Sequence, residues 1–266
     1  MTDATKTPPA YLKIAKHRLA YLATPVAGKA DIVFLHGHGS DMHGDKAQAI
    51  AEWATRQGFG CLRFDYFGHG ASSGDMADGT ISQWKADVLA MLDSQIKGDC
   101  YVVGSSLGGW LMLLAAEARP TLKQGGRIKG LVGIAAAPDF TETLIWQTLT
   151  PAQQKAMAKD GHIALANPYS DDPVVYPYRL ITDGRNNLLL GRGSPLAITC
   201  PVRLLHGMRD AEVPPATAQA IADALPAETD VQVMLDADAD HRFSQPDQID
   251  TILATLAEIT RQDKTA

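Results

Sequence analysis

The sequence is poor in cysteine, lacks long apolar runs and carries no excess of positive charge. Its three cysteines, Cys61, Cys100 and Cys200, are widely spaced among apolar residues, which predicts reduced thiols rather than a disulfide framework. No apolar run approaches the roughly 18–20 residues of a membrane span, so we expect no stable membrane insertion. A formal net charge of −6 without a basic stripe gives no reason to expect a nucleic-acid partner.

Targeting signals are also missing from the first residues. The stretch "MTDATKTPPA" has neither the charged-then-apolar pattern of a signal peptide nor the Arg-rich pattern of an organelle presequence. Hydrophobic residues make up 45% of the chain and charged residues 20%, ordinary values for a globular protein with a sizeable core. These features together predict a cytoplasmic protein.

Strand-like and helical patterns alternate along the chain. Residues 31–37, "DIVFLHG", form a compact apolar run, and residues 46–58, "KAQAIAEWATRQG", follow with helical spacing and a terminal Gly. The same alternation predicts strands at residues 61–65, 100–105, 128–136, 200–207 and 230–235, and helices at residues 82–96, 106–120, 216–225 and 246–260. It indicates an α/β fold with a mostly parallel sheet covered by helices on both faces. Residues 12–28 have no intervening helix and predict an antiparallel edge hairpin.

One region interrupts this alternation. Residues 139–194 contain clusters of Pro, Gly and Asn, several aromatic residues and an amphipathic stretch at residues 140–149. An insertion of this length in a compact domain is usually a lid or a binding element. We therefore expect one domain over residues 1–266 with a lid insertion at about 139–194. The alternative is a solvent-facing decoration.

The most informative motif is "GSSLG" at residues 104–108, which fits G-x-S-x-G. It lies where a predicted strand passes into a predicted helix, the setting in which a sharp turn exposes the central serine. Ser106 is therefore the candidate nucleophile. The backbone N–H of Leu107, the next residue, is a candidate oxyanion donor.

A serine nucleophile needs a base, and the base needs an orienting carboxylate. For a G-x-S-x-G turn of this kind the expected chain order is serine, acid, histidine, each after a strand. Asp210 in "RLLHGMRDAEVP" and His241 in "DADHRF" both follow later predicted strands in that order. We predict a triad of Ser106, Asp210 and His241.

Other acidic residues near His241 suggest two alternatives. Asp236, Asp238 and Asp240 could form a calcium loop, but an EF-hand loop that starts at Asp236 needs Gly at its sixth position and Glu at its twelfth, and this chain has neither there. Any of the three could be the triad acid, although their closeness in sequence to the base disfavours them. We expect the loop at residues 64–74, "FDYFGHGASSG", to be a structural turn.

The stretch "HGHGSDMHGD" at residues 36–45 resembles a metal-binding loop. A binuclear metallohydrolase pattern would be H-x-H-x-D-H, whereas Asp41 lies three residues after His38 and His43 does not adjoin it. The stretch follows a predicted strand at which this kind of fold supplies a second oxyanion donor. We expect the backbone N–H of His38 to be that donor and Gly39, in the same turn, to line the substrate pocket. The histidine side chains would then line the pocket or lie on the surface.

These segments resemble the serine hydrolases of the α/β-hydrolase fold, and more narrowly the family of alpha/beta hydrolase domain-containing protein 10 and its bacterial relatives. "GSSLGGWLM" and "RLLHGMRD" are the specific motifs, and the likeness extends over most of the chain. The resemblance implies thioesterase activity on S-acylated, including palmitoylated, protein cysteines and esterase activity on acyl glucuronides. It also implies Ser106, Asp210 and His241 as the triad.

The resulting hypothesis is a serine hydrolase that cleaves esters or thioesters of acylated small molecules or proteins, with no metal or organic cofactor. Alternatives are a general carboxylesterase or lactonase, a metal-dependent hydrolase, and a non-catalytic binding module, against which the intact Ser-Asp-His set argues. Within the lid we expect acyl-chain contacts, or else internal packing, from four large side chains: Trp146, Leu149, Tyr176 and Tyr178.

If the second oxyanion donor is the backbone N–H of His38, two substitutions should differ in their effect. His38→Ala keeps the N–H and should be tolerated far better than Ser106→Ala, which removes the nucleophile. Loss of one oxyanion donor typically costs about 10²–10³ in turnover. Steady-state ester hydrolysis by both variants checks this, and near-complete inactivation by His38→Ala alone would contradict the backbone role.

Overall fold

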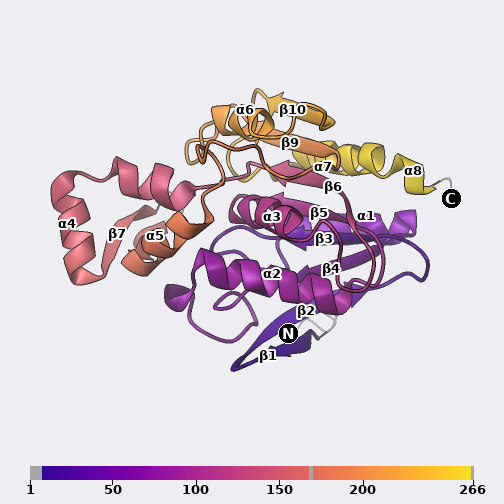
Figure 1. The fold of residues 1–266 in the computed structure, drawn as a ribbon, viewed down its shortest axis with the longest axis horizontal. Coiled ribbons are helices and arrows are strands. Elements are labelled where there is room, and N and C mark those ends of the chain that lie inside the picture. The colour runs from indigo at the N-terminus through magenta and orange to yellow at the C-terminus, as the bar shows by residue number, and fades with distance from the viewer. Residues whose placement is uncertain (1–7, 168–169, 265–266) are drawn as a thin grey trace.

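The computed structural model describes residues 8–167 and 170–264 and contains a central eight-stranded sheet (Figure 1). The strand order is β1-β2-β4-β3-β5-β6-β9-β10. β1 and β2 form an antiparallel hairpin, β2 pairs antiparallel with β4, and the other neighbours are parallel. The strands are β1 (Ala10–Ile14), β2 (His17–Thr24), β3 (Asp31–Leu35), β4 (Gly60–Phe64), β5 (Cys100–Ser105), β6 (Ile128–Ile134), β9 (Val202–Gly207) and β10 (Val231–Asp236). The predicted mostly parallel sheet and its antiparallel edge hairpin are confirmed.

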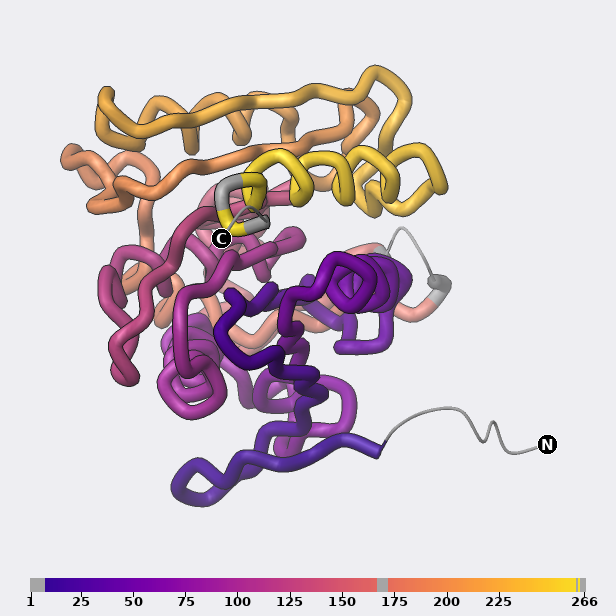
Figure 2. The backbone as a smooth tube through the Cα atoms, turned by 90° about the vertical axis from the view of Figure 1, so that its right-hand side faces the viewer, coloured from indigo at the N-terminus to yellow at the C-terminus, as the bar shows by residue number. Residues whose placement is uncertain are grey.

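Helices cover both faces of this sheet, and each face has its own hydrophobic cluster. α1 and α7 pack on one face, where Ile50 and Ile252 are buried, and Figure 2 shows these two helices next to each other. α2, α3 and α6 pack on the other face through side chains that include Trp84, Trp110 and Ile221. The bounds are α1 (Asp45–Gln57), α2 (Ile81–Gln95), α3 (Leu107–Ala118), α6 (Ala216–Asp223) and α7 (Pro246–Ile259), followed by the short α8 (Arg261–Lys264). The burial of β3 and β5 over their full length follows from this two-sided cover.

The chain between β6 and β9 forms the insertion that projects from the core on the left of Figure 1. It contains a short π-helix η2 (Thr141–Ile145), a 3₁₀ turn η3 (Trp146–Thr148), α4 (Pro151–Asp160), the antiparallel pair β7 (His162–Asn167) and β8 (Ser170–Pro177), α5 (Tyr178–Gly184) and the 3₁₀ turn η4 (Arg185–Asn187). Its own hydrophobic cluster buries Ile145, Leu149, Met157 and Ile181. The division into one domain with a lid stays a prediction.

The two ends of the insertion are joined by one buried carboxylate. Asp139 adopts a positive φ of 62°, and its side chain accepts the N–H groups of Leu189 (2.8 Å) and Leu190 (2.7 Å). The indole N–H of Trp110 in α3 donates to the carbonyl of Asn187 (3.1 Å). These contacts fix the base of the insertion against the core.

A further short 3₁₀ turn, η1 (Met76–Asp78), precedes α2. Within the described ranges, no helix is both long enough and apolar enough to cross a membrane.

Candidate active site

Ser106 lies in a sharp turn between β5 and α3. Its backbone has φ 53° and ψ −116°, a conformation that few non-glycine residues adopt. The neighbouring glycines make the turn possible, because a Cβ on Gly104 would lie 2.3 Å from the carbonyl oxygen of Gly108, and one on Gly108 would lie 2.1 Å from that of Leu35. The Ser106 carbonyl accepts the N–H of Ala137 (3.1 Å). The turn is thereby held against the carboxyl ends of both neighbouring strands.

Three side chains from separate loops meet at this edge of the sheet. Nε2 of His241 lies 3.0 Å from Oγ of Ser106, and Nδ1 of His241 lies 2.8 Å from Oδ2 of Asp210. Asp210 follows β9 and His241 follows β10. The Asp210 side chain is fully buried, whereas that of His241 is 13% exposed. The distances suit a proton path from the hydroxyl to the imidazole, with the carboxylate fixing the imidazole tautomer.

The Asp210 carboxylate is surrounded by hydrogen-bond donors. Oδ1 accepts the N–H groups of Glu212 (2.9 Å) and Val213 (2.8 Å), while Oδ2 faces His241 and also Nε2 of His206, at 3.0 Å. Burial raises the pKa of Asp210, but the hydrogen bonds from His206 and His241 outweigh it and hold the pKa well below its usual range. The group is therefore ionised at neutral pH and can stabilise an imidazolium beside it.

The loop after β3 lies against the Ser106 turn. A Cβ on Gly37 would be 3.4 Å from Cβ of Ser106, and Gly39 adopts a left-handed φ of 69°. Leu107 is the first residue of α3, where the N–H has no acceptor within the helix and the helix dipole favours negative charge. The structure thus brings His38 and Leu107 to the same edge as Ser106. Their role as oxyanion donors stays a prediction.

Comparison with known proteins decides the family. Residues 32–251 match the Alpha/beta hydrolase family. The chain belongs to the alpha/beta hydrolase family.

Among curated proteins, this hydrolase is 38% identical over 229 residues to mouse "Palmitoyl-protein thioesterase ABHD10, mitochondrial", covering 86% of this chain and 74% of that protein. It is 35% identical to the Bos taurus protein of the same name, covering 96% and 85%. Because these relatives are named mitochondrial, the cytoplasmic location expected from the sequence stays a prediction.

Solved structures of similar proteins have the same fold. "Alpha/beta hydrolase domain-containing protein 10 from mouse" superposes with a TM-score of 0.86 at 35% identity, covering 96% of this hydrolase and 99% of that chain. A putative hydrolase from Agrobacterium vitis S4 superposes with a TM-score of 0.88 at 34% identity, covering 96% and 98%. The α/β-hydrolase fold and the family expected from the sequence motifs are confirmed.

The ring of His38 packs among aromatic side chains of this hydrolase. It stacks on Tyr176 of the insertion, with centroids 5.9 Å apart and an interplanar angle of 28°, and has edge contacts with Trp84 and His69. Burial, with His69 next to it, lowers the pKa of His38 to about 4, so the ring is neutral at pH 7. Within the described parts of the chain, no group of three or more His, Cys, Asp or Glu residues is placed to hold a metal ion.

The four predicted acyl contacts of the lid lie in different places. Leu149 is buried in the insertion's own hydrophobic cluster. Trp146 packs on Tyr178, with centroids 5.7 Å apart, and carries the guanidinium of Arg185 over its ring. Tyr176 reaches the loop after β3 through His38. Acyl-chain contact by these four residues stays a prediction.

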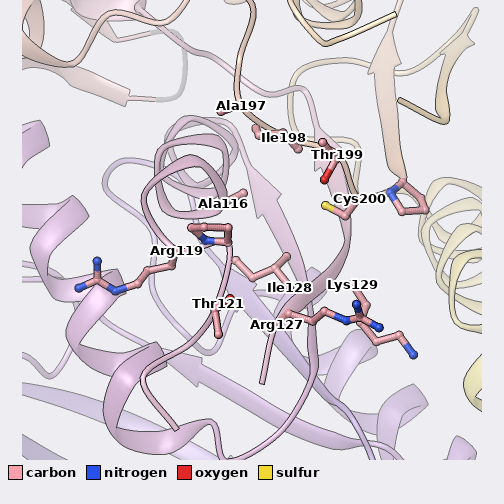
Figure 3. Close-up of a pocket in the computed structure, with 12 residues that line it drawn as sticks. Ala116, Arg119, Thr121, Arg127, Ile128, Lys129, Ala197, Ile198, Thr199 and Cys200 are labelled. Carbon is pink, nitrogen blue, oxygen red and sulfur yellow. The ribbon is translucent and has the colours of Figure 1, made fainter. Parts of the chain in front are cut away.

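A cavity of about 440 Å³ lies at the opposite edge of the sheet, beside the amino ends of β6 and β9 (Figure 3). Two of its basic residues are paired, Arg119 with Asp93 and Lys129 with Asp263. Burial raises the pKa of its Cys200 thiol to about 11, so little nucleophilic thiolate forms at neutral pH. Neither the Ser106 turn nor the other triad candidates line this cavity.

Replacing Asp210 by Asn tests the carboxylate. The amide retains the size but cannot fix the same imidazole tautomer, so kcat should fall about 10³–10⁴-fold, as in other triads. Ester hydrolysis, with circular dichroism as the folding control, measures this, and a decrease in kcat of less than tenfold would contradict the assignment.

The same substitution tests the contribution of the carboxylate to stability. The depressed pKa of Asp210 contributes stability above the unfolded-state pKa of about 4, and this contribution is lost as pH falls. The difference in free energy of unfolding between wild type and variant should therefore shrink below about pH 4.

Proposed function

We propose that this protein is a serine hydrolase that cleaves acyl thioesters and esters through an acyl-enzyme, with S-acylated protein cysteines as its substrate class. The observation that carries the proposal is the continuous contact from Ser106 through His241 to the buried carboxylate of Asp210. The relatives named palmitoyl-protein thioesterase support the acyl class.

The geometry gives each side chain one task. Neutral His241 accepts the hydroxyl proton of Ser106 at Nε2 while the oxygen attacks the acyl carbonyl. The oxyanion that develops is held by the N–H groups of Leu107 and His38. The C–S or C–O bond of the tetrahedral intermediate then breaks, and the imidazolium, whose charge Asp210 stabilises, gives its proton to the departing thiolate or alkoxide. Water, activated by the same imidazole, releases the acid and restores the serine.

An apolar groove beside this edge is suited to the acyl chain. It has a volume of about 370 Å³, within the range of small-molecule sites, and no charged side chain contributes to its walls among the described residues. Pro138 at its border follows Ala137, which is bonded to the Ser106 carbonyl, and Val213 is bonded to Asp210. The walls are Pro138, Thr143, Leu144, Leu190, Val213, Pro214, Ala216, Thr217 and Ala220. The insertion and α6 thus line an apolar groove whose wall residues adjoin Ala137 and Asp210.

The location belongs to the same proposal. The three cysteines are free, and Cys61 and Cys100 are buried among apolar residues. Burial raises the pKa of Cys61 to about 12, as for an inert structural thiol. Free, unreactive thiols suit a reducing compartment such as the cytoplasm, where glutathione keeps cysteines reduced.

Paired assays test the reaction. Wild type should hydrolyse a palmitoyl thioester and be labelled by a fluorophosphonate probe, and Ser106→Ala should lose both properties. Cleavage of short p-nitrophenyl esters without any hydrolysis of the palmitoyl thioester would indicate a small-ester carboxylesterase instead. Labelling that persists in Ser106→Ala would refute the nucleophile assignment.

Filling the groove tests where the acyl chain lies. Each buried methylene contributes about 0.8 kcal/mol, or roughly fourfold in kcat/KM. Ala220→Trp should therefore lower kcat/KM for the palmitoyl thioester about tenfold or more while leaving a butyryl thioester nearly unchanged. Gln219→Trp, an exposed neighbour in α6 outside the groove, is the matched control. If kcat/KM depends on acyl-chain length in the same way for the two variants, the acyl chain does not lie in this groove.

A further inference from the structure

His206 is a buried histidine beside Asp210, and the reaction described above gives it no role. It lies near the end of β9 and is 1% exposed. Its Nε2 lies 3.0 Å from Oδ2 of Asp210 and 3.0 Å from the carbonyl oxygen of Val213. Both oxygens are acceptors only, because the Asp210 carboxylate is ionised at neutral pH. Nε2 must therefore carry the proton.

We propose that His206 is a positioning residue for hydrolysis, whose Nε2–H holds the Asp210 carboxylate in the orientation that receives His241. The inference rests on the proposed function, since it assigns a role within the same site.

Oδ2 is the atom that connects the two imidazoles. It accepts Nδ1–H of His241 at 2.8 Å and faces Nε2–H of His206 at 3.0 Å. Oδ1 is held by the N–H groups of Glu212 and Val213. Rotation of the carboxylate about its Cβ–Cγ bond would disrupt the contacts of both oxygens, so it has one favoured orientation.

The second contact of His206 fixes the loop that carries the acid. Its Nε2–H bonds the Val213 carbonyl, and the N–H of the same Val213 bonds Asp210. Strand β9, the turn at residues 210–213 and the carboxylate are thus closed into one hydrogen-bonded ring. Because His206, Asp210 and Val213 are buried, water cannot replace a missing donor cheaply.

Loss of this donor has an effect on the base that a purely structural role would not have. With fewer donors, the carboxylate concentrates more of its charge on His241 and favours the imidazolium form. The base then becomes protonated at higher pH, so the acidic limb of kcat/KM moves upward. The Glu212 carboxylate, 4.0 Å from Nε2 of His241, faces the same ring and is unchanged in the variants.

The test compares His206→Leu with His206→Gln. Leu removes the donor and should lower kcat about 10- to 100-fold, with KM little changed and the acidic limb moved to higher pH. Gln places an amide N–H near the position of Nε2 and should restore kcat to within a few-fold of wild type and return the limb. Initial rates from pH 5 to 9, and the rate of fluorophosphonate labelling of Ser106, measure these effects.

The chain offers a matched control outside the triad. His17 lies 3.1 Å from the fully buried carboxylate of Asp87, between β2 and α2. His17→Leu also removes an imidazole from a buried aspartate, so it should lower stability without moving the acidic limb. If His206→Leu behaves like His17→Leu, or if His206→Gln loses as much activity as His206→Leu, the positioning role is wrong. Absence of Ser106-dependent turnover in wild type would instead refute the proposed function.

Discussion

The 3.0 Å contact between the Ser106 hydroxyl and Nε2 of His241 is the interaction on which the proposed chemistry depends. It exists because the backbone of Ser106 accepts an unfavourable φ of 53°, which points the side chain out of the sheet edge. That strain persists because Gly104 and Gly108 allow β3, β5 and α3 to approach within distances that any side chain would prevent. Packing of the core thus maintains the position of a reactive group that local preferences alone would not produce.

From the interior outward, the ionised carboxylate of Asp210 is followed by the imidazole of His241 and then by the hydroxyl of Ser106. A fully buried carboxylate, Asp210, keeps its charge because it is surrounded by N–H donors. The partly exposed His241 lies between this charge and the hydroxyl, so the proposed proton transfer would occur where substrate can arrive. On the other side of the serine, the neutral ring of His38 packs on Tyr176 and connects the insertion to the loop after β3.

Much of this arrangement could be predicted from the sequence, for identifiable reasons. β3 and β5 are buried on both faces, so they appear as uninterrupted apolar runs, and the chain order Ser106, Asp210, His241 follows from strands that end at one edge. The function of His206 could not be predicted from its position four residues before Asp210, since the informative contact is a distance between side chains. The contacts of Asp139 could not be predicted either, because their partners lie about fifty residues further along the chain.

The carboxylate of Asp139 brings the two ends of the insertion together. It accepts the N–H groups of residues 189 and 190, so about fifty residues leave and re-enter the core at almost the same point. Closure at a single point means that the intervening segment can change in length or sequence while the strands beneath it keep their register. The segment that lines the groove and the sheet edge that carries Ser106 are therefore separate parts of the chain, joined at this one carboxylate.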